Sequence, residues 1–474
     1  MKSYGIIAAL CLTTSLFAET PAKPNIVFIN IDDLGYADIG PYGSKLNRTP
    51  NLDRMANEGR KLTSFYAAPV CSPSRAALMT GCYPKRVLPI PHVLFPGNAI
   101  GLSPKEITVA EVLKAAGYAT AIVGKWHLGD QPEFLPNNQG FDLHFGLPYS
   151  NDMGTAENGA KSDLGKPIPM TKGNAQPPLP LLRNGKVVKR MTPDDQQSLV
   201  EIYTKEAVDF ITKNKAQPFF LYLPHNAVHF PIYPGKAWAG KSPNGIFSDW
   251  VEEMDWGVGR VLDTLRDLGL AEKTLVIFTS DNGGTQRSVN APLRGHKNTT
   301  FEGGMRVPTI AWWPGQIPAG THTDAITGMF DILPTCAYLS GGKLPNDRKI
   351  DGGNLWPVLA GPADAKPVHD VFYYFKGLTL EGVRQGDWKL HRPVIAKEAI
   401  KTSLYNLKTD IAEANDVAAA NPKIVKSLEA LFNEMKTDLG TEGIGPGVRE
   451  LGKVTDAKPI IAPDGTVRPG FESK

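Results

Sequence analysis

The sequence predicts an α/β fold, with a mostly parallel sheet sandwiched by helices and a small C-terminal α+β part that contains an antiparallel sheet. Long apolar runs such as residues 24–33 do not alternate with polar residues, which is typical of parallel strands buried on both faces. Segments with strand and helix patterns alternate up to about residue 365. Beyond residue 365 the apolar residues alternate with polar ones, as in antiparallel strands.

The elements of the first part follow in order along the chain. The strand at 24–33 ends in two carboxylates, and the helix at 51–59 carries Leu52 and Met55 at helical spacing before Gly59 stops it. Residues 150–200 are rich in Gly, Pro, Asn and Lys and are predicted to form a long excursion over the active face. The other predicted elements are strands at 61–67, 118–127, 218–224 and 274–280 and helices at 71–80, 108–117, 198–214 and 248–269.

The C-terminal part contains three predicted strand segments, a helix and a tail. The strands lie within 371–377, 380–392 and 403–410, the helix covers 422–439, and the remainder has enough Gly, Pro and charge to form an extended tail. We therefore divide the chain into a domain at 24–365 and a C-terminal α+β subdomain at 366–474.

The N-terminus predicts export. Lys2, an apolar stretch over residues 5–18 and the small residue Ala18 are typical of a signal peptide over residues 1–18, cleaved near Ala18. This stretch is shorter than a membrane-spanning helix, and no later one reaches that length. We expect a periplasmic or secreted protein without a membrane span. The net charge of +3 falls to +2 when Lys2 is removed, which argues against nucleic acid as a partner.

Three cysteines remain after cleavage: Cys71, Cys82 and Cys336. An odd number permits at most one disulfide, so the chain is not a disulfide scaffold. Cys336 lies in an apolar, helix-like stretch and is most simply a buried residue, while Cys82 is either buried likewise or paired with Cys336.

Oxygen ligands follow two predicted strands. Asp32 and Asp33 end the first, and Asp281 and Asn282 follow the strand at 274–280. Because ligands collect at the carboxyl ends of parallel strands, these side chains favour a hard cation such as Ca²⁺ or Mg²⁺. The alternative is that both segments are turns, in which Asp, Asn and Gly are common.

Cationic side chains form a second group of candidate site residues. These side chains could bind an anionic ester and stabilise the negative charge that develops as the ester bond breaks. For several members, namely His225, Arg294, His296 and Arg306, a structural role is the better interpretation. The candidates for the site are Arg75, Lys125, His127, His229 and Lys297.

Cys71 is placed at the start of a helix. Pro73 fits a first helical turn, so Cys71 lies near the positive end of the helix dipole, where anions bind and thiol pKa values fall. A thiolate nucleophile, a metal ligand and a buried residue all remain open on these grounds.

The segment Cys-Ser-Pro-Ser-Arg at 71–75, followed by AALMTG, resembles the C-x-P-S-R motif of the type I sulfatases. The similarity extends in order over nearly the whole chain after the predicted cleavage site, through NIVFINIDDLGYADIGPYG, TPNLDRMANEG, TVAEVLKAAGYATAIVGKWHLG, TLVIFTSDNGG and GHKNTTFEGGMRVPTIAWWPG. The segments QGFDLHFGLPYSNDM and LPLLRNG are most similar to the branch of arylsulfatase A and N-acetylgalactosamine-6-sulfatase. The resemblance implies an alkaline-phosphatase-like fold.

The resemblance also implies a chemistry. A formylglycine-generating enzyme would convert Cys71 to formylglycine (3-oxoalanine), whose hydrated form attacks sulfur while one Ca²⁺, rather than Mg²⁺, is bound. The metal ligands would be Asp32, Asp33, residue 71, Asp281 and Asn282. Arg75 and Lys125 would hold the diol and the sulfate, His127 would assist release of sulfate, and His229 and Lys297 would lie at the bridging ester oxygen. Ser150 would line the sulfate pocket.

The substrate expected from this resemblance is a sulfated carbohydrate, with aryl sulfates also cleaved. A phosphate or phosphonate ester hydrolase of the same superfold is the closest alternative, although Asp281-Asn282 without a neighbouring histidine favours one metal ion over two. A second alternative is an inactive protein that binds sulfated glycans, if Cys71 stays unmodified. The oligomeric state is not predicted.

Overall fold

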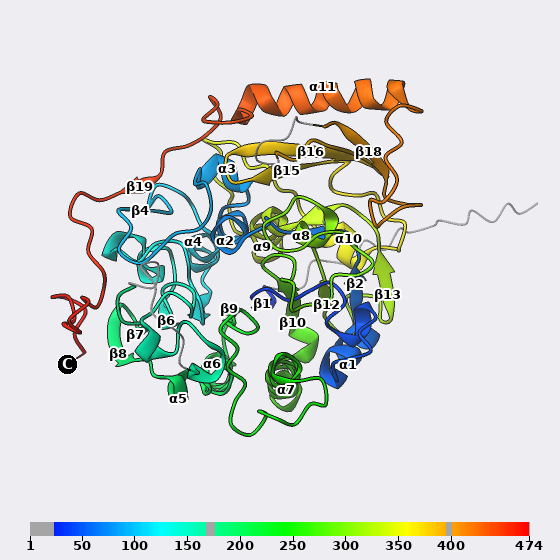
Figure 1. Ribbon diagram of the computed structural model, residues 1–474. Helices are drawn as coiled ribbons and strands as arrows, with labels where there is room; N and C mark the ends of the chain where they lie inside the picture. The colour runs from blue at the N-terminus through cyan, green and yellow to red at the C-terminus, as the bar shows by residue number, and fades with distance from the viewer. Residues whose placement is uncertain (1–22, 167–175, 395–400, 474) are drawn as a thin grey trace, which may run out of the picture.

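A ten-stranded sheet forms the centre of the computed structural model, which describes residues 23–166, 176–394 and 401–473 (Figure 1). The inner strands run parallel to one another, β12 (Ile310–Trp312) and β7 (Pro180–Arg183) pair antiparallel with the inner strands beside them, and β8 (Lys186–Arg190) pairs antiparallel with β7. The predicted mostly parallel sheet is therefore confirmed. In spatial order the strands are β13 (Thr321–Thr323), β2 (Arg60–Leu62), β12 (Ile310–Trp312), β10 (Thr274–Ser280), β1 (Asn25–Ile31), β9 (Phe219–Pro224), β5 (Ala119–Val123), β6 (Leu143–Gly146), β7 (Pro180–Arg183) and β8 (Lys186–Arg190).

Helices cover both faces of this sheet. Ile26 and Phe28 of β1 pack in one apolar core with α2, α4 and α9, whereas Val27 and Ile29 pack in a second core with α1, α6 and α7. A strand buried on both faces explains why its sequence is apolar without alternation. The helices are α1 (Pro50–Glu58), α2 (Cys71–Thr80), α3 (Pro84–Val87), α4 (Val109–Ala115), α5 (Pro193–Gln196), α6 (Leu199–Asn214), α7 (Ile246–Asp267), α8 (Glu302–Met305), α9 (Ile332–Ser340) and α10 (Trp356–Ala360).

The C-terminal part is a four-stranded antiparallel sheet with one long helix on its outer side, at the top of Figure 1. The strands are β15 (Val371–Lys376), β16 (Thr379–Gln385), β17 (Trp388–His391) and β18 (Ser403–Asn406), and the helix is α11 (Pro422–Leu439). The face that α11 turns to the sheet consists of Leu428, Phe432, Met435 and Leu439, all buried. Each such burial stabilises the fold by about 1.5–3 kcal/mol.

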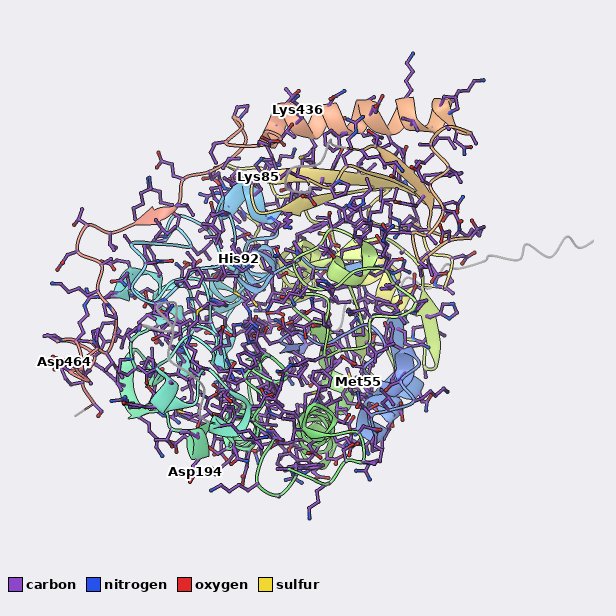
Figure 2. The ribbon with its side chains drawn as sticks, in the orientation of Figure 1. Met55, Lys85, His92, Asp194, Lys436 and Asp464 are labelled. Atoms are coloured by element: carbon purple, nitrogen blue, oxygen red, sulfur yellow. The ribbon has the colours of Figure 1, made fainter. Side chains whose placement is uncertain are left out.

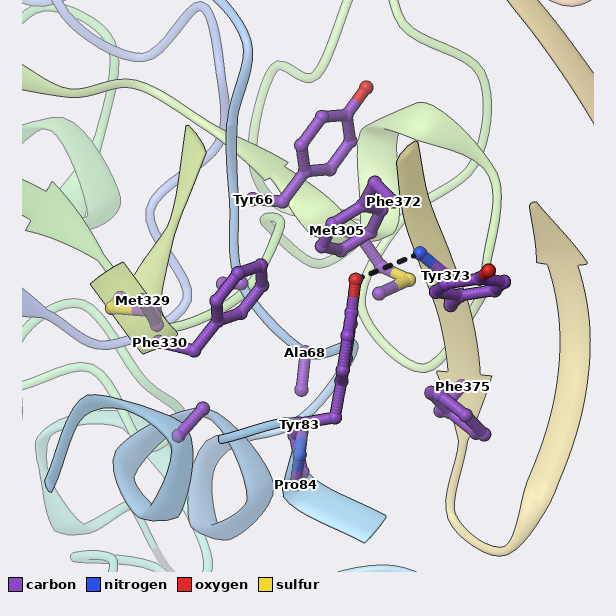
Figure 3. Close-up of a pocket in the computed structure, with 12 residues that line it drawn as sticks. Tyr66, Ala68, Tyr83, Pro84, Met305, Met329, Phe330, Phe372, Tyr373 and Phe375 are labelled. Carbon is purple, nitrogen blue, oxygen red and sulfur yellow. Dashed lines mark hydrogen bonds between the residues drawn. The ribbon is translucent and has the colours of Figure 1, made fainter. Parts of the chain in front are cut away.

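Aromatic residues join this sheet to the α2 side of the first part (Figure 3). Tyr66 stacks on Phe372 with ring centroids 4.3 Å apart, and the backbone N–H of Tyr373 donates to Tyr83 Oη over 3.2 Å. The cavity among them measures about 20 Å³, which is room for little more than one water. Both parts therefore share one apolar core, and the boundary at residue 365 stays a prediction.

Two predicted segments differ from the structure. Residues 180–190, within the predicted excursion, form the hairpin β7–β8 at the edge of the main sheet, because Asn184 and Gly185 both adopt the positive φ that a tight hairpin turn requires. The predicted strand at 61–67 is divided between β2 and β3 (Phe65–Tyr66), which belong to different sheets. β3 pairs with β11 (Arg306–Val307) and β14 (Thr327–Gly328).

The tail returns to the first part of the chain. β19 (Gly452–Lys453) pairs with β4 (Ile100–Gly101), and Glu472 forms a bridge with Val187. The predicted signal peptide at 1–18 lies outside the described residues. Among the described residues, no helix combines the length and apolar character needed to cross a membrane.

Candidate active site

The oxygen ligands predicted from the sequence lie together at one edge of the sheet. β1 and β10 are parallel neighbours, so the residues that follow them meet. Asn282 Nδ2 donates to Asp33 Oδ1 over 2.8 Å, and the backbone N–H of Asp33 points to Asp281 Oδ1 at 3.4 Å. Asp32 is fully buried beside them. The four residues therefore form one group of buried oxygen atoms.

Cys71 is the first residue of α2, and Pro73 lies in its first turn, as predicted. Its Sγ is 3.4 Å from Asp32 Oδ1. Burial, and then the negative charges of Asp281 and Asp32, raise the pKa of the Cys71 thiol well above its usual value. Burial and these charges therefore act against a thiolate at the unmodified residue.

Arg75 and Lys125 lie on the α2 side of the carboxylates. The Arg75 guanidinium donates twice to Asp281 Oδ2, from Nε at 3.0 Å and Nη2 at 2.7 Å, and its Nη1 donates to the carbonyl of Lys125 at 2.6 Å. Lys125 Nζ forms an ion pair with Asp32. All four side chains are buried, so these charges act on one another with little screening by water.

Lys297 approaches from the loop before α8. Its Nζ lies 2.6 Å from Asp33 Oδ1 and 3.7 Å from Cys71 Sγ. Burial alone would raise the pKa of the Asp32 carboxyl, but the charges of Lys125, His229, Arg75 and Lys297 together hold it below its usual value. The Asp32 carboxyl is therefore ionised, whereas burial and then the charge of Asp32 raise the pKa of Asp281.

Two histidines complete the group. His127 Nε2 lies 3.0 Å from the Leu94 carbonyl, which can only accept, so Nε2 carries the proton and the buried Nδ1 is left without a partner among the described residues. Burial, and then Lys125 and Arg75, lower the pKa of His127 well below its usual value, so this imidazole is neutral. Its free Nδ1 is a proton acceptor.

His229 lies between two of the predicted site residues. Its Nε2 is 3.7 Å from Asp33 Oδ2, and its Nδ1 is 3.2 Å from Ser150 Oγ and close to the Phe230 carbonyl. Ser150 itself follows β6 and is buried. The structure thus brings together every site residue named from the sequence.

Of the four residues interpreted as structural, three have polar partners, and both ring nitrogens of the fourth, His225, receive no hydrogen bond from the described residues. His225 is buried, and burial lowers its pKa to about 4, so it is a neutral core residue. Arg306 pairs with Glu302 at 3.5 Å, and Arg294 donates to the carbonyl of Glu413 at 2.8 Å. His296 remains partly exposed, with Nδ1 near the carbonyl of Lys297.

The cysteines outside the site are free. Cys336 is buried in α9, and Cys82 is buried next to Arg449, whose Nη2 is 3.3 Å from the sulfur. The possible Cys82–Cys336 disulfide is therefore not formed.

The sequence patterns did not single out two further residues, Asp38 and His92. Asp38 is buried and accepts hydrogen bonds from Gly35 N at 2.7 Å and Val289 N at 2.8 Å, which fixes the turn after Asp33 against the loop after Asn282. Desolvation, and then the charges of Lys297 and Lys376, lower the pKa of His92. An Asp three residues after the DDLG segment could have indicated the first, whereas no sequence pattern indicated the second.

The donor set fits a hard divalent cation. Asp32, Asp33, Cys71 and His229 each offer a ligand atom, and these atoms lie within 4.8 Å of one another. Asn282 Oδ1 is buried beside them without a hydrogen bond from any described residue. A buried amide oxygen without a donor is costly unless something else satisfies it. Carboxylate and amide oxygens are the ligands that Ca²⁺ prefers.

Comparisons with known proteins agree with this geometry. The profile of the family described as Sulfatase matches residues 24–342. N-acetylgalactosamine-6-sulfatase of Sus scrofa is 41% identical over 395 residues, covering 78% of this chain and 72% of the relative. Human arylsulfatase A is 38% identical over 460 residues, covering 89% of each chain. The solved structure of Ps i-CgsB in complex with k-i-k-neocarrahexaose superposes with a TM-score of 0.74 at 31% identity, covering 87% of this chain and 92% of that one. This chain belongs to the sulfatase family and is a sulfuric ester hydrolase.

Proposed function

We propose that the enzyme removes sulfate from sulfated glycans at residue 71, with that residue present as formylglycine and one Ca²⁺ bound beside it. The observation that carries the proposal is the position of Cys71, whose Sγ lies 3.4 Å from a carboxylate oxygen of Asp32 and 3.7 Å from Lys297 Nζ. Residue 71 therefore stands between the candidate metal ligands and the cations that suit an anionic ester.

Formylglycine would supply a hydrated aldehyde as oxygen nucleophile, and Ca²⁺ would supply positive charge next to it. Asp32, Asp33, Asp281 and Asn282 would hold the ion, together with residue 71. The orphaned Asn282 Oδ1 and the cluster of donor atoms around Asp33 support this assignment.

The cations of the chain would bind the sulfate group. Arg75, Lys125 and Lys297 are fixed by ion pairs with the carboxylates, so they need little reorganisation when an anionic ester enters. Their positive charge would stabilise the negative charge that grows on the sulfate oxygens.

The two histidines are suited to opposite proton transfers. His127 is neutral with a free Nδ1, so it would accept a proton from residue 71. The Phe230 carbonyl can only accept, so it favours a proton on Nδ1 of His229, and the ring would act as general acid in its doubly protonated form, passing the Nε2 proton to the leaving alcohol. Ser150 Oγ would keep the His229 ring in this orientation.

The proposed substrate class is a sulfated glycan that contains galactose-type sugars. One relative is named for N-acetylgalactosamine 6-sulfate, and one neighbour was solved with a carrahexaose.

Hydrolysis of p-nitrophenyl sulfate, compared with p-nitrophenyl phosphate, tests the reaction, and a panel of sulfated galactan and chondroitin oligosaccharides tests the substrate class. Peptide mass spectrometry should find residue 71 lighter than cysteine by about 18 Da, the difference between a thiol and an aldehyde. Cys71→Ala should abolish turnover, whereas Cys336→Ala, at a buried thiol of α9, should retain it. Faster turnover of phosphate than of sulfate, or full activity with an unmodified Cys71, would contradict the proposal.

A further inference from the structure

A second hollow of the molecule lies outside the site at Cys71. It has a volume of about 860 Å³, within the range of roughly 300–1,000 Å³ of small-ligand sites. Its walls come from Arg48, from α5 and the start of α6, from α7 and from the segment 235–241. The residues that the argument uses are Asp194, Glu201, Lys236, Trp238, Glu253 and Trp256.

Two tryptophans form one wall of this hollow. The rings of Trp238 and Trp256 have centroids 6.2 Å apart and planes inclined by 49°, and both side chains are partly exposed. Large aromatic rings are normally buried or used for binding, because exposing them to water is unfavourable. Partly exposed indole faces beside polar groups suit the apolar face of a sugar ring.

A buried carboxyl group lies among the lining residues. Glu253 is 1% exposed, and its Oε2 accepts a hydrogen bond from the backbone N–H of Gly235 at 2.7 Å. Its Oε1 receives no hydrogen bond from any residue that the structure describes. Burial raises the pKa of Glu253 to about 8, so the group is protonated at neutral pH and can both donate and accept. Sugar hydroxyls offer both functions.

The charges around the hollow nearly cancel. Lys236 Nζ lies 3.2 Å from Asp194, and Arg48 pairs with Glu252. With Glu253 protonated, the remaining charged lining groups are Lys241 and Glu201, one of each sign. A neutral, hydroxyl-rich ligand therefore fits this hollow better than a phosphate or another strong anion.

The hollow lies toward the same edge of the sheet as Cys71. α7 leads from the end of β9 to the start of β10, and α6 leads into the start of β9, so both helices begin at the edge where the parallel strands end. A hydrogen bond of 3.1 Å from Asn151 Nδ2 to Gln196 Oε1 connects the neighbour of Ser150 with the segment before α6. Asp194 lies at the lower border of the molecule in Figure 2, opposite Lys436 on α11.

We propose that this hollow is a second saccharide-binding site, in which a neutral sugar ring packs on Trp238 and Trp256 and hydrogen-bonds to Glu253. It would hold a stretch of glycan away from the ester that is cleaved. The choice of galactose-type glycan rests on the proposed function, whereas the site itself does not depend on chemistry at residue 71.

The test uses fully desulfated neocarrahexaose, which lacks the ester that the Cys71 site would bind. Calorimetric titration should detect binding to the full chain, weakened roughly tenfold in Trp238→Leu and in Trp256→Leu, because leucine fills space but offers no aromatic face. Trp388→Leu, at a partly exposed tryptophan of β17, is the matched control and should bind like the unaltered protein.

Turnover of p-nitrophenyl sulfate separates this proposal from the proposed function. It should stay unchanged in Trp238→Leu and Trp256→Leu, which also shows that both variants are folded. Absence of hexaose binding to the unaltered protein, or equal binding by all variants, would overturn the second site. Binding by a protein with no sulfatase turnover would support the second site and contradict only the proposed function.

Discussion

Substitution of Lys389 is expected to cause the largest loss of stability among the changes considered below. This lysine of β17 is fully buried, and its Nζ lies 3.0 Å from Glu302 and 2.7 Å from Glu413. Burial alone would lower the pKa of Lys389, but the two carboxylates raise it, so the side chain is charged. It connects the C-terminal sheet with α8, which directly follows the loop that carries Lys297.

Lys389→Met removes the charge and keeps most of the side-chain volume. Two carboxylates then face each other without the cation between them, and removal of one partner from a buried ion pair costs about 3–5 kcal/mol. Glu302 keeps hydrogen bonds from Tyr66 Oη at 2.6 Å and Tyr374 Oη at 2.8 Å, whereas Glu413 keeps the one from the backbone N–H of Glu302 at 2.7 Å, so the larger part of the penalty falls on Glu413. We expect a loss of about 3–5 kcal/mol in the free energy of unfolding at pH 7.

Urea unfolding monitored by tryptophan fluorescence measures this difference. The variant Lys389→Met/Glu413→Gln should recover most of the loss, because the unpaired charge is gone. Lys408→Met, at an exposed lysine just after β18, is the matched control and should change the unfolding free energy by no more than about 0.5 kcal/mol. A loss below about 1 kcal/mol for Lys389→Met, or no recovery in the double variant, would refute the assignment of this ion pair as a stabilising contact.

Three further predictions concern the sites. Asn282→Leu should weaken Ca²⁺ binding, measured by calorimetry, by at least about 10–100-fold, while Asn433→Leu, at an exposed position of α11, loses no metal affinity; equal affinity would remove Asn282 from the ligand set. Arg75→Lys should reduce kcat for p-nitrophenyl sulfate by about tenfold or more, because lysine cannot reproduce the two hydrogen bonds to Asp281; a change confined to KM would contradict this reasoning. Burial raises the pKa of the Glu253 carboxyl from 4.5 to about 8 in the folded protein. The folded state therefore binds one more proton than the unfolded state between these values, and the unaltered protein loses stability as pH rises from about 4.5 to 8. Glu253→Gln cannot titrate, so its thermal stability relative to the unaltered protein should increase over the same pH range. A stability difference that does not vary over this range would show that Glu253 is ionised in the folded protein.

Local patterns determined most of the fold. The apolar strands β1, β9 and β10 and the helices α6, α7 and α11 occur within a few residues of their predicted limits, because their periodicity reflects which faces are buried. The candidate ligands follow from the same patterns, since a carboxylate directly after a buried parallel strand has only one edge of the sheet at which to lie.

Contacts between distant residues decided the rest. Arg75 meets Asp281 across 206 residues, and Lys389 meets Glu302 across 87, so no local pattern specifies either pair. The thiol of Cys71 illustrates the physical reason. Its helix position, which the sequence predicts, would lower its pKa, but burial and the charges of Asp281 and Asp32 raise it. The sequence by itself determined which residues could carry the chemistry, and tertiary packing decided their protonation, their partners and the hollow at Trp238 and Trp256, because burial and charge proximity exist only once the chain is folded.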